Sequence, residues 1–156
     1  IAVTVALERV DADVRASDIS VGALDTARQN AAELGAKVEF AQGSWFDTDR
    51  PSEGRYDVIV SNPPYIESGD EHLSQGDLRF EPQNALTDFS DGLSHIRHIT
   101  QEAPKYLKAD GLLLFEHGYD QGEAVRNIML ENGFAEVATE QDLAGLDRVT
   151  LGRLPA

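Results

Sequence analysis

The chain has 156 residues, of which 41% are hydrophobic and 26% charged, and it contains no cysteine, which excludes disulfides and thiolate metal sites within it. Its 28 acidic and 13 basic residues give a net charge of −15, which repels phosphate backbones and argues against direct nucleic-acid binding. Because these residues show no signal-peptide pattern and no apolar run long enough to cross a bilayer, we expect a cytoplasmic protein with no membrane partner.

The first third of the chain alternates helix and strand patterns. Residues 1–10 are typical of a helix, and because no N-cap precedes Ile1 we expect the chain to begin inside a longer protein. A strand is predicted at 13–18. Ser20 is expected to cap a helix that runs to Leu34 and ends at Gly35, with Leu24, Ala27, Ala31 and Leu34 on one face.

The rest of the chain continues this alternation. Strands are predicted at 37–42 and 56–61, and apolar spacing predicts a helix over 92–108 that Pro104 should kink or restart. A buried strand at 111–118, a helix at 121–133 and two antiparallel strands at 134–141 and 147–154 complete the pattern. Alternating strands and helices favour a mostly parallel α/β sheet with helices on both faces.

Polar groups stand at three predicted strand ends, and ligands of such sheets bind beyond the carboxyl ends of the strands. Asp18 ends the first strand, where a carboxylate can accept both hydroxyls of a ribose; alternatively it is only an acid at a helix entry. Trp45 follows the second strand, where its ring can cover an adenine or simply fill core space. Together these two residues indicate a nucleoside site.

The third strand ends in Asn62-Pro63-Pro64-Tyr65. The Asn62 side-chain carbonyl is an acceptor, and Pro64 restricts the residue before it, so that the Pro63 carbonyl points in a fixed direction. Two fixed acceptors can hold both hydrogens of a planar –NH₂ group, and Tyr65 can stack on its plane. Because the lone pair of such a nitrogen is delocalised, positioning matters more for its reactivity than a strong base.

These residues resemble a known family. An Asn-Pro-Pro-Tyr motif after a strand is the signature of S-adenosylmethionine-dependent methyltransferases that act on –NH₂ nitrogens. The surrounding segments are similar to the HemK/PrmC family, which methylates the glutamine of the Gly-Gly-Gln motif in peptide-chain release factors. The similar segments span the chain: "SWF" at 44–46, "VSNPPYI" at 60–66, "GDLRFEP" at 76–82, "EHGYDQGEAVR" at 116–126 and "DRVTLGR" at 147–153.

The resemblance implies a Rossmann-like α/β methyltransferase fold, S-adenosylmethionine as cofactor and release factors as protein partners. It assigns the target glutamine to the catalytic residues Asn62, Pro63, Pro64 and Tyr65. It assigns cofactor binding to Asp18, Ser44, Trp45, Phe46 and Asn62, with Asp18 on the ribose and Trp45 near the adenine. Ser44 departs from the pattern, since an acid that bonds the adenine amino group often stands there.

The family's first strand, its Gly-rich loop of the Asp-x-Gly-x-Gly-x-Gly type and its N-terminal helical domain have no counterpart in residues 1–156. We therefore expect 1–156 to be a partial catalytic domain that binds the cofactor weakly and is inactive alone. An exposed sheet edge at the position of the first strand would favour self-association.

Two other functions stay open on the sequence. An adenine-N6 nucleic-acid methyltransferase shares the motif, although the net charge opposes it, and a remnant without activity would keep the fold. His95 and His98 have a spacing that zinc can use, but no further ligands cluster nearby and no metal is expected. His117 is interpreted as a structural histidine, and Arg79 with Glu81 as a structural pair beside the site.

Overall fold

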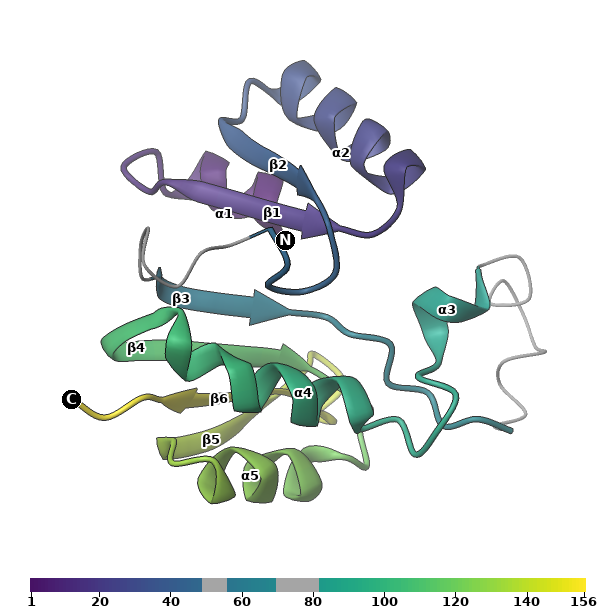
Figure 1. The fold of residues 1–156 in the computed structure, drawn as a ribbon, viewed down its shortest axis with the longest axis vertical. Coiled ribbons are helices and arrows are strands. Elements are labelled where there is room, and N and C mark those ends of the chain that lie inside the picture. Colours follow the sequence, from purple (N-terminus) through teal and green to yellow (C-terminus); the bar gives the residue numbers. More distant parts are fainter. Residues whose placement is uncertain (49–55, 70–81) are drawn as a thin grey trace. The chain divides into compact units, whose positions relative to one another are not determined.

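The computed structural model describes residues 1–48, 56–69 and 82–156. The chain divides into two compact units, Ile1–Glu53 and Gly54–Ala156, and each is described by itself (Figure 1). The first unit contains α1 (Ala2–Glu8), β1 (Val14–Asp18), α2 (Val21–Leu34) and β2 (Val38–Gln42). The second unit contains β3 (Tyr56–Ser61), α3 (Gln83–Leu86), α4 (Ser94–Glu102), the 3₁₀ helix η3 (Ala103–Lys105), β4 (Leu107–Glu116), α5 (Gly122–Glu131), β5 (Ala135–Gln141) and β6 (Asp147–Arg153).

In the first unit, β1 and β2 pair in parallel, with Asp18 opposite Gln42 at their carboxyl ends. The predicted caps of α2 are confirmed: the Ser20 hydroxyl accepts the Ala23 N–H at 3.2 Å, and Gly35 closes the helix with a left-handed φ of 70°. The predicted buried face is too wide, because Leu34 is 60% exposed. Ten residues at 3.6 per turn rotate Leu34 by about 80° from the buried Leu24.

In the second unit, the strands form one sheet in the order β3-β4-β6-β5. The β3–β4 pair is parallel and the other two pairs are antiparallel, so the sheet is mixed rather than mostly parallel, and the predicted antiparallel pairing of the last two strands is confirmed. Helices α4 and α5 contact each other on one face of this sheet (Figure 1). The core beneath them includes Ile96, Ile99, Leu113, Phe115 and Met129, all fully buried.

Pro104 interrupts the predicted helix 92–108 as expected, but the predicted range is too long at both ends, since α4 begins at Ser94 and Leu107 and Lys108 belong to β4. Helix α4 ends at Glu102, Pro104 lies in the separate turn η3, and β4 begins at Leu107. A proline has no N–H for the helical hydrogen bond and its ring collides with the preceding turn, so the helix cannot continue unchanged. The strand consequently starts four residues earlier than predicted.

Within the described ranges, none of the helices has both the length and the apolar character required to cross a bilayer.

Candidate active site

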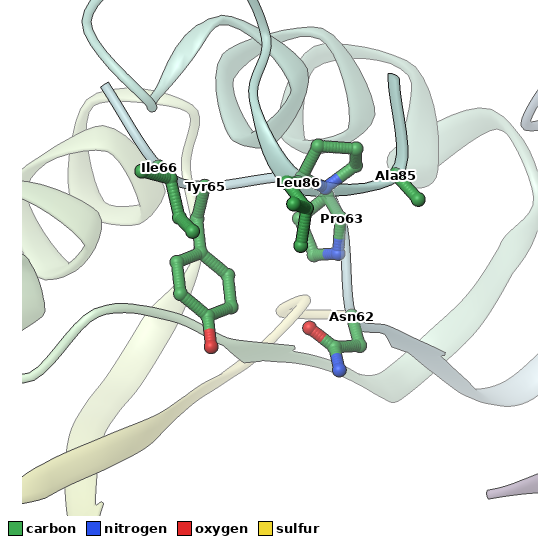
Figure 2. Close-up of a pocket in the computed structure, with 7 residues that line it drawn as sticks. Asn62, Pro63, Tyr65, Ile66, Ala85 and Leu86 are labelled. Carbon is green, nitrogen blue, oxygen red and sulfur yellow. The ribbon is translucent and has the colours of Figure 1, made fainter. Parts of the chain in front are cut away.

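The segment that leaves β3 forms one wall of a pocket of about 280 Å³ (Figure 2). The predicted motif is brought together here: the pocket is lined by Asn62, Pro63, Pro64, Tyr65, Ile66, Ala85 and Leu86. Pro63 is fully buried, whereas Asn62 is exposed. Figure 2 shows the side chains of Asn62 and Tyr65 extending from the segment in the same direction, with the amide oxygen of Asn62 on the Tyr65 side. A planar group that enters the pocket therefore meets an amide acceptor and an aromatic ring.

The opposite wall is α3 and the chain that follows it. The Ile66 N–H donates to the Leu86 carbonyl at 2.9 Å, Ile66 and Thr87 form an isolated parallel bridge, and the Ser68 N–H donates to the Ser90 carbonyl at 2.9 Å. These backbone bonds join the segment after β3 to residues about 20 positions later. The two walls of the pocket are thus joined by backbone hydrogen bonds.

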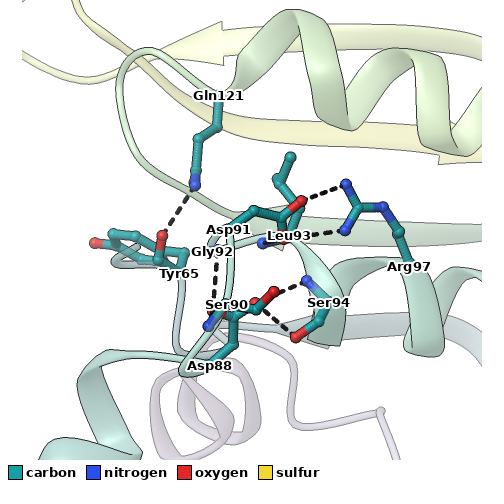
Figure 3. A network of polar contacts seen from close by, with 9 residues as sticks. All are labelled: Tyr65, Asp88, Ser90, Asp91, Gly92, Leu93, Ser94, Arg97 and Gln121. Atoms are coloured by element: carbon teal, nitrogen blue, oxygen red, sulfur yellow. Dashed lines mark hydrogen bonds and ion pairs between the residues drawn. The ribbon is translucent and has the colours of Figure 1, made fainter. Parts of the chain in front are cut away.

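Asp88 organises the turn beyond this wall (Figure 3). Its carboxylate accepts the N–H groups of Ser90, Gly92 and Ser94 at 2.8–2.9 Å and the Ser94 hydroxyl at 2.6 Å. Burial acts to raise the pKa of Asp88, but these hydrogen bonds to the ionised form outweigh it and lower the pKa to about 2. The turn therefore depends on an ionised Asp88, and Asp88 stays ionised at neutral pH.

Sequence reasoning missed two residues that contact the motif. Gln121, just before α5, donates its Nε2 hydrogen to the Tyr65 carbonyl at 2.9 Å (Figure 3). Gly92, which is buried and has a φ of 75°, packs so closely that a Cβ there would lie 2.3 Å from the same carbonyl oxygen. The sequence contained Gln121 only within the "EHGYDQG" segment of the family resemblance, and no local pattern predicted its contact with Tyr65.

His117 has the structural role that the sequence indicated. Its ring is fully buried, with Nδ1 2.8 Å from the Gly118 carbonyl and Nε2 2.7 Å from the Thr150 hydroxyl. Burial lowers the pKa of His117 below its usual value, so the ring is neutral at physiological pH. Nearby, the Arg148 side chain donates to the His117 carbonyl and pairs with Asp142 at 3.1 Å.

Four of the predicted cofactor residues belong to the first unit: Asp18, Ser44, Trp45 and Phe46. The fifth, Asn62, belongs to the second unit. Asp18 is exposed at the end of β1, and its Oδ1 accepts the Ser20 N–H at 2.7 Å, which orients the carboxylate. Trp45 is half-buried in a turn with a left-handed φ of 46°, and its carbonyl accepts the Ser17 hydroxyl at 3.3 Å. Ser44 and Phe46 flank it and are also half-buried.

Two further expectations concern other residues. Arg79 and Glu81 lie outside the described residues. In the part of the chain that the structure describes, no three histidine or acidic side chains gather in a group that could hold a metal ion.

Comparison with protein-family models matches residues 1–79 to the methyltransferase small domain. A release factor glutamine methyltransferase of Neisseria gonorrhoeae is 72% identical over 153 residues, which are 98% of this chain and 56% of that protein. A release factor glutamine methyltransferase of Bordetella pertussis is 49% identical over 154 residues, 99% of this chain and 57% of that protein. The chain thus spans about half the length of the curated relatives it matches.

Solved structures agree with the fold. A methyltransferase from Pyrococcus furiosus matches 97% of this chain and 68% of its own with a TM-score of 0.71 at 16% identity, which supports the fold alone. A release factor-specific protein-(glutamine-N5) methyltransferase from Alicyclobacillus acidocaldarius matches 92% of this chain and 81% of its own, with a TM-score of 0.50 at 25% identity. The predicted α/β methyltransferase fold is confirmed.

Proposed function

From the premise that the chain belongs to the methyltransferase small domain family and is homologous to release factor glutamine methyltransferases, we propose that it is the partial catalytic domain of an enzyme that methylates release factors. The reaction is transfer of a methyl group from S-adenosylmethionine to the side-chain amide nitrogen of the glutamine in the Gly-Gly-Gln motif. The observation that carries this proposal is the pocket formed by Asn62 through Tyr65 at the carboxyl end of β3.

The pocket supplies acceptors and a stacking surface rather than a strong base. In the proposed complex, the Asn62 amide oxygen and the Pro63 carbonyl accept the two N–H groups of the target amide, and the Tyr65 ring stacks on its plane. When bound, S-adenosylmethionine would supply the methyl group to this nitrogen and leave as S-adenosylhomocysteine, and one N–H proton would pass to solvent. The part of Asn62, Pro63 and Tyr65 is to hold the nitrogen in one orientation, which lowers the entropic part of the barrier.

The first unit offers groups that fit the nucleoside of this cofactor, which supplies the methyl group when bound. The exposed, oriented carboxylate of Asp18 can accept ribose hydroxyls. The half-buried ring of Trp45 offers a flat surface for adenine, with Ser44 and Phe46 beside it. Asn62, the first residue after β3, is proposed to contact both cofactor and target. Because release factors work on ribosomes, we also propose a cytoplasmic location.

Transfer of a methyl group to a purified release factor tests the proposal. The full-length protein, with isotopically labelled S-adenosylmethionine, is expected to label a release factor and to add the mass of one methyl group to the peptide that contains Gly-Gly-Gln. A release factor in which this glutamine is replaced by alanine is the matched control and should stay unlabelled. Labelling of a nucleic acid instead would show that the adenine-N6 alternative is right.

A further inference from the structure

The side-chain amide of Gln121 joins two backbone segments beside the pocket. Its Nε2 donates to the Tyr65 carbonyl at 2.9 Å, and its Oε1 accepts the Gly118 N–H at 2.8 Å (Figure 3 shows the first bond). Gln121 occupies the N-cap position of α5, yet its side chain makes no capping hydrogen bond to that helix. The amide is therefore committed to the contact between the motif and the β4–α5 loop.

This contact completes the fixation of one peptide group. The carbonyl of the Tyr65–Ile66 peptide bond is held by Gln121, and the N–H of the same peptide bond donates to the Leu86 carbonyl at 2.9 Å. A planar peptide group that is held at both polar ends cannot rotate about the flanking bonds. The orientation of Tyr65, whose ring lines the pocket, follows from this plane.

A largely buried chain of hydrogen bonds anchors the other side of Gly118. Arg126 donates to the Thr139 hydroxyl at 2.7 Å, Thr139 contacts Thr150 at 2.8 Å, Thr150 contacts His117 Nε2 at 2.7 Å, and His117 Nδ1 contacts the Gly118 carbonyl at 2.8 Å. A carbonyl only accepts, so a neutral His117 donates from Nδ1 to Gly118 and accepts at Nε2 from the Thr150 hydroxyl, which leaves Thr150 to accept from Thr139. The ring is neutral because burial lowers the pKa of His117, and the chain of hydrogen bonds holds the Gly118 backbone that Gln121 uses as its support.

We propose that Gln121 is a positioning residue for methyl transfer, which acts by fixing the Tyr65–Ile66 peptide and thereby the face of the pocket that orients the target amide. This inference rests on the proposed function of the pocket. It predicts that loss of the Gln121 donor lowers the rate of transfer while leaving the affinity for the cofactor unchanged, because the side-chain hydrogen bonds of Gln121 go to Tyr65 and Gly118 and not to the candidate nucleoside residues.

Gln121→Glu in the full-length protein is the sharpest variant. The new side chain can still accept the Gly118 N–H, but a carboxylate oxygen replaces the NH₂ group opposite the Tyr65 carbonyl, and two acceptors repel each other. Asn132→Asp is the matched control, since Asn132 Nδ2 also donates to a backbone carbonyl, that of Ile128, at 2.8 Å. It lies at the far end of the ten-residue helix α5, about 15 Å along the helix axis.

The expected result is a decrease in kcat of about 10–100-fold for Gln121→Glu, since displacement of a positioning group by about 1 Å costs up to that much. The KM for S-adenosylmethionine should stay within about twofold, and Asn132→Asp should keep its kcat. If Gln121→Glu does not fold, Gln121→Met, which removes both hydrogen bonds at similar length without adding charge, is expected to lower kcat as well. A kcat near the parent value for the Gln121 variant, or an equal loss in the Asn132 control, would overturn the inference.

The amide resonance of Ile66 separates this inference from the proposed function. It reports the clamped peptide directly and needs no activity. Gln121→Glu should shift the Ile66 resonance, and Asn132→Asp should leave it in place. If the parent protein does not methylate release factors, the proposed function fails, while the resonance still decides whether Gln121 holds this peptide. An unchanged Ile66 resonance in Gln121→Glu would overturn the inference on its own.

Discussion

Gly92→Ala introduces a methyl group where the Tyr65 carbonyl and the Gln121 amide leave no space. The Cβ would lie 2.3 Å from the Tyr65 carbonyl oxygen and 2.8 Å from Gln121 Nε2. Side-chain carbons essentially never approach another heavy atom closer than 3.0 Å, so the carbonyl must retreat by about 0.7 Å, the difference between 3.0 and 2.3 Å. The displaced carbonyl belongs to the peptide that positions Tyr65.

Two effects of Gly92→Ala have to be separated. Alanine in a left-handed conformation costs about 1–2 kcal/mol of stability wherever it occurs. Gly133→Ala is the matched control, because Gly133 has a φ of 85° in the same unit and a Cβ added there would have no atom within 4 Å. The control therefore carries the conformational cost alone, whereas Gly92→Ala adds the displacement. From the steep dependence of rate on geometry, we expect Gly92→Ala to lower kcat by roughly 10–100-fold.

Steady-state methyl transfer to a release factor, together with urea unfolding of each variant, tests this expectation. Gly133→Ala should lose stability and keep its kcat. Gly92→Ala should lose more stability and also lose rate under conditions in which it is fully folded. If Gly92→Ala and Gly133→Ala have the same kcat within about threefold, the close approach at Tyr65 has no bearing on catalysis and the reasoning fails.

Three further predictions concern the target amide, the buried histidine and the cofactor. Asn62→Ala should lower single-turnover methyl transfer by about 10²–10³-fold and change cofactor affinity less, because it removes one preorganised acceptor; a rate near the parent value would contradict its role. As the pH falls below about 6.5, His117 takes up a proton in the unfolded chain, whereas its ring stays neutral in the fold because burial lowers its pKa. The free energy of unfolding should therefore decrease. His117→Gln should weaken this pH dependence in urea titrations. Residues 1–156 produced alone should bind S-adenosylmethionine weakly in calorimetry and give no turnover, since they contain no Asp-x-Gly-x-Gly-x-Gly loop; micromolar binding with turnover would contradict this.

A second decrease in the free energy of unfolding, at lower pH, is expected from Asp88. Its pKa is about 2 in the fold against an ordinary 3.8, so its contribution is present above about pH 4 and is lost as the pH falls toward 2. The full difference corresponds to about 2.4 kcal/mol, and solvent screening of this partly exposed carboxylate reduces it to about 1 kcal/mol. In urea titrations, Asp88→Asn should remove this decrease below pH 4 and leave the decrease below pH 6.5 that is due to His117.

Local signals in the sequence predicted most of the elements. The Ser20 and Gly35 caps are readable because capping depends on a few neighbouring residues, and Ile96 and Ile99 are buried as their helical spacing predicts. Leu107 is also buried, but it belongs to β4 and not to the predicted helix. The gathering of Asn62 through Tyr65 in one pocket was predictable for the same reason, since four consecutive residues at a strand end stay together in any fold.

Contacts between distant segments were not predictable. Tyr65 and Gln121 are 56 positions apart, and nothing in either local pattern indicates that an amide donor meets that carbonyl. Gly92 was predicted only as the first residue of the helix 92–108, whereas it precedes α4 with a φ of 75°, because its requirement comes from the atoms packed against it and not from its neighbours in sequence. The position of Leu34 shows the related limit that apolar spacing does not determine how wide a buried face is.

Every described contact that fixes Tyr65 comes from the second unit: Leu86 and Gly92 from the chain after α3, and Gln121 from the loop before α5. The candidate nucleoside residues, Asp18 and Trp45 among them, are oriented by bonds within the first unit, to Ser20 and Ser17. Substitutions that move the Tyr65–Ile66 peptide should therefore act on the geometry of the target amide, whereas substitutions at the end of β1 should act on cofactor affinity. We expect these two groups of substitutions to separate effects on kcat from effects on cofactor affinity, because each group disturbs a different set of hydrogen bonds.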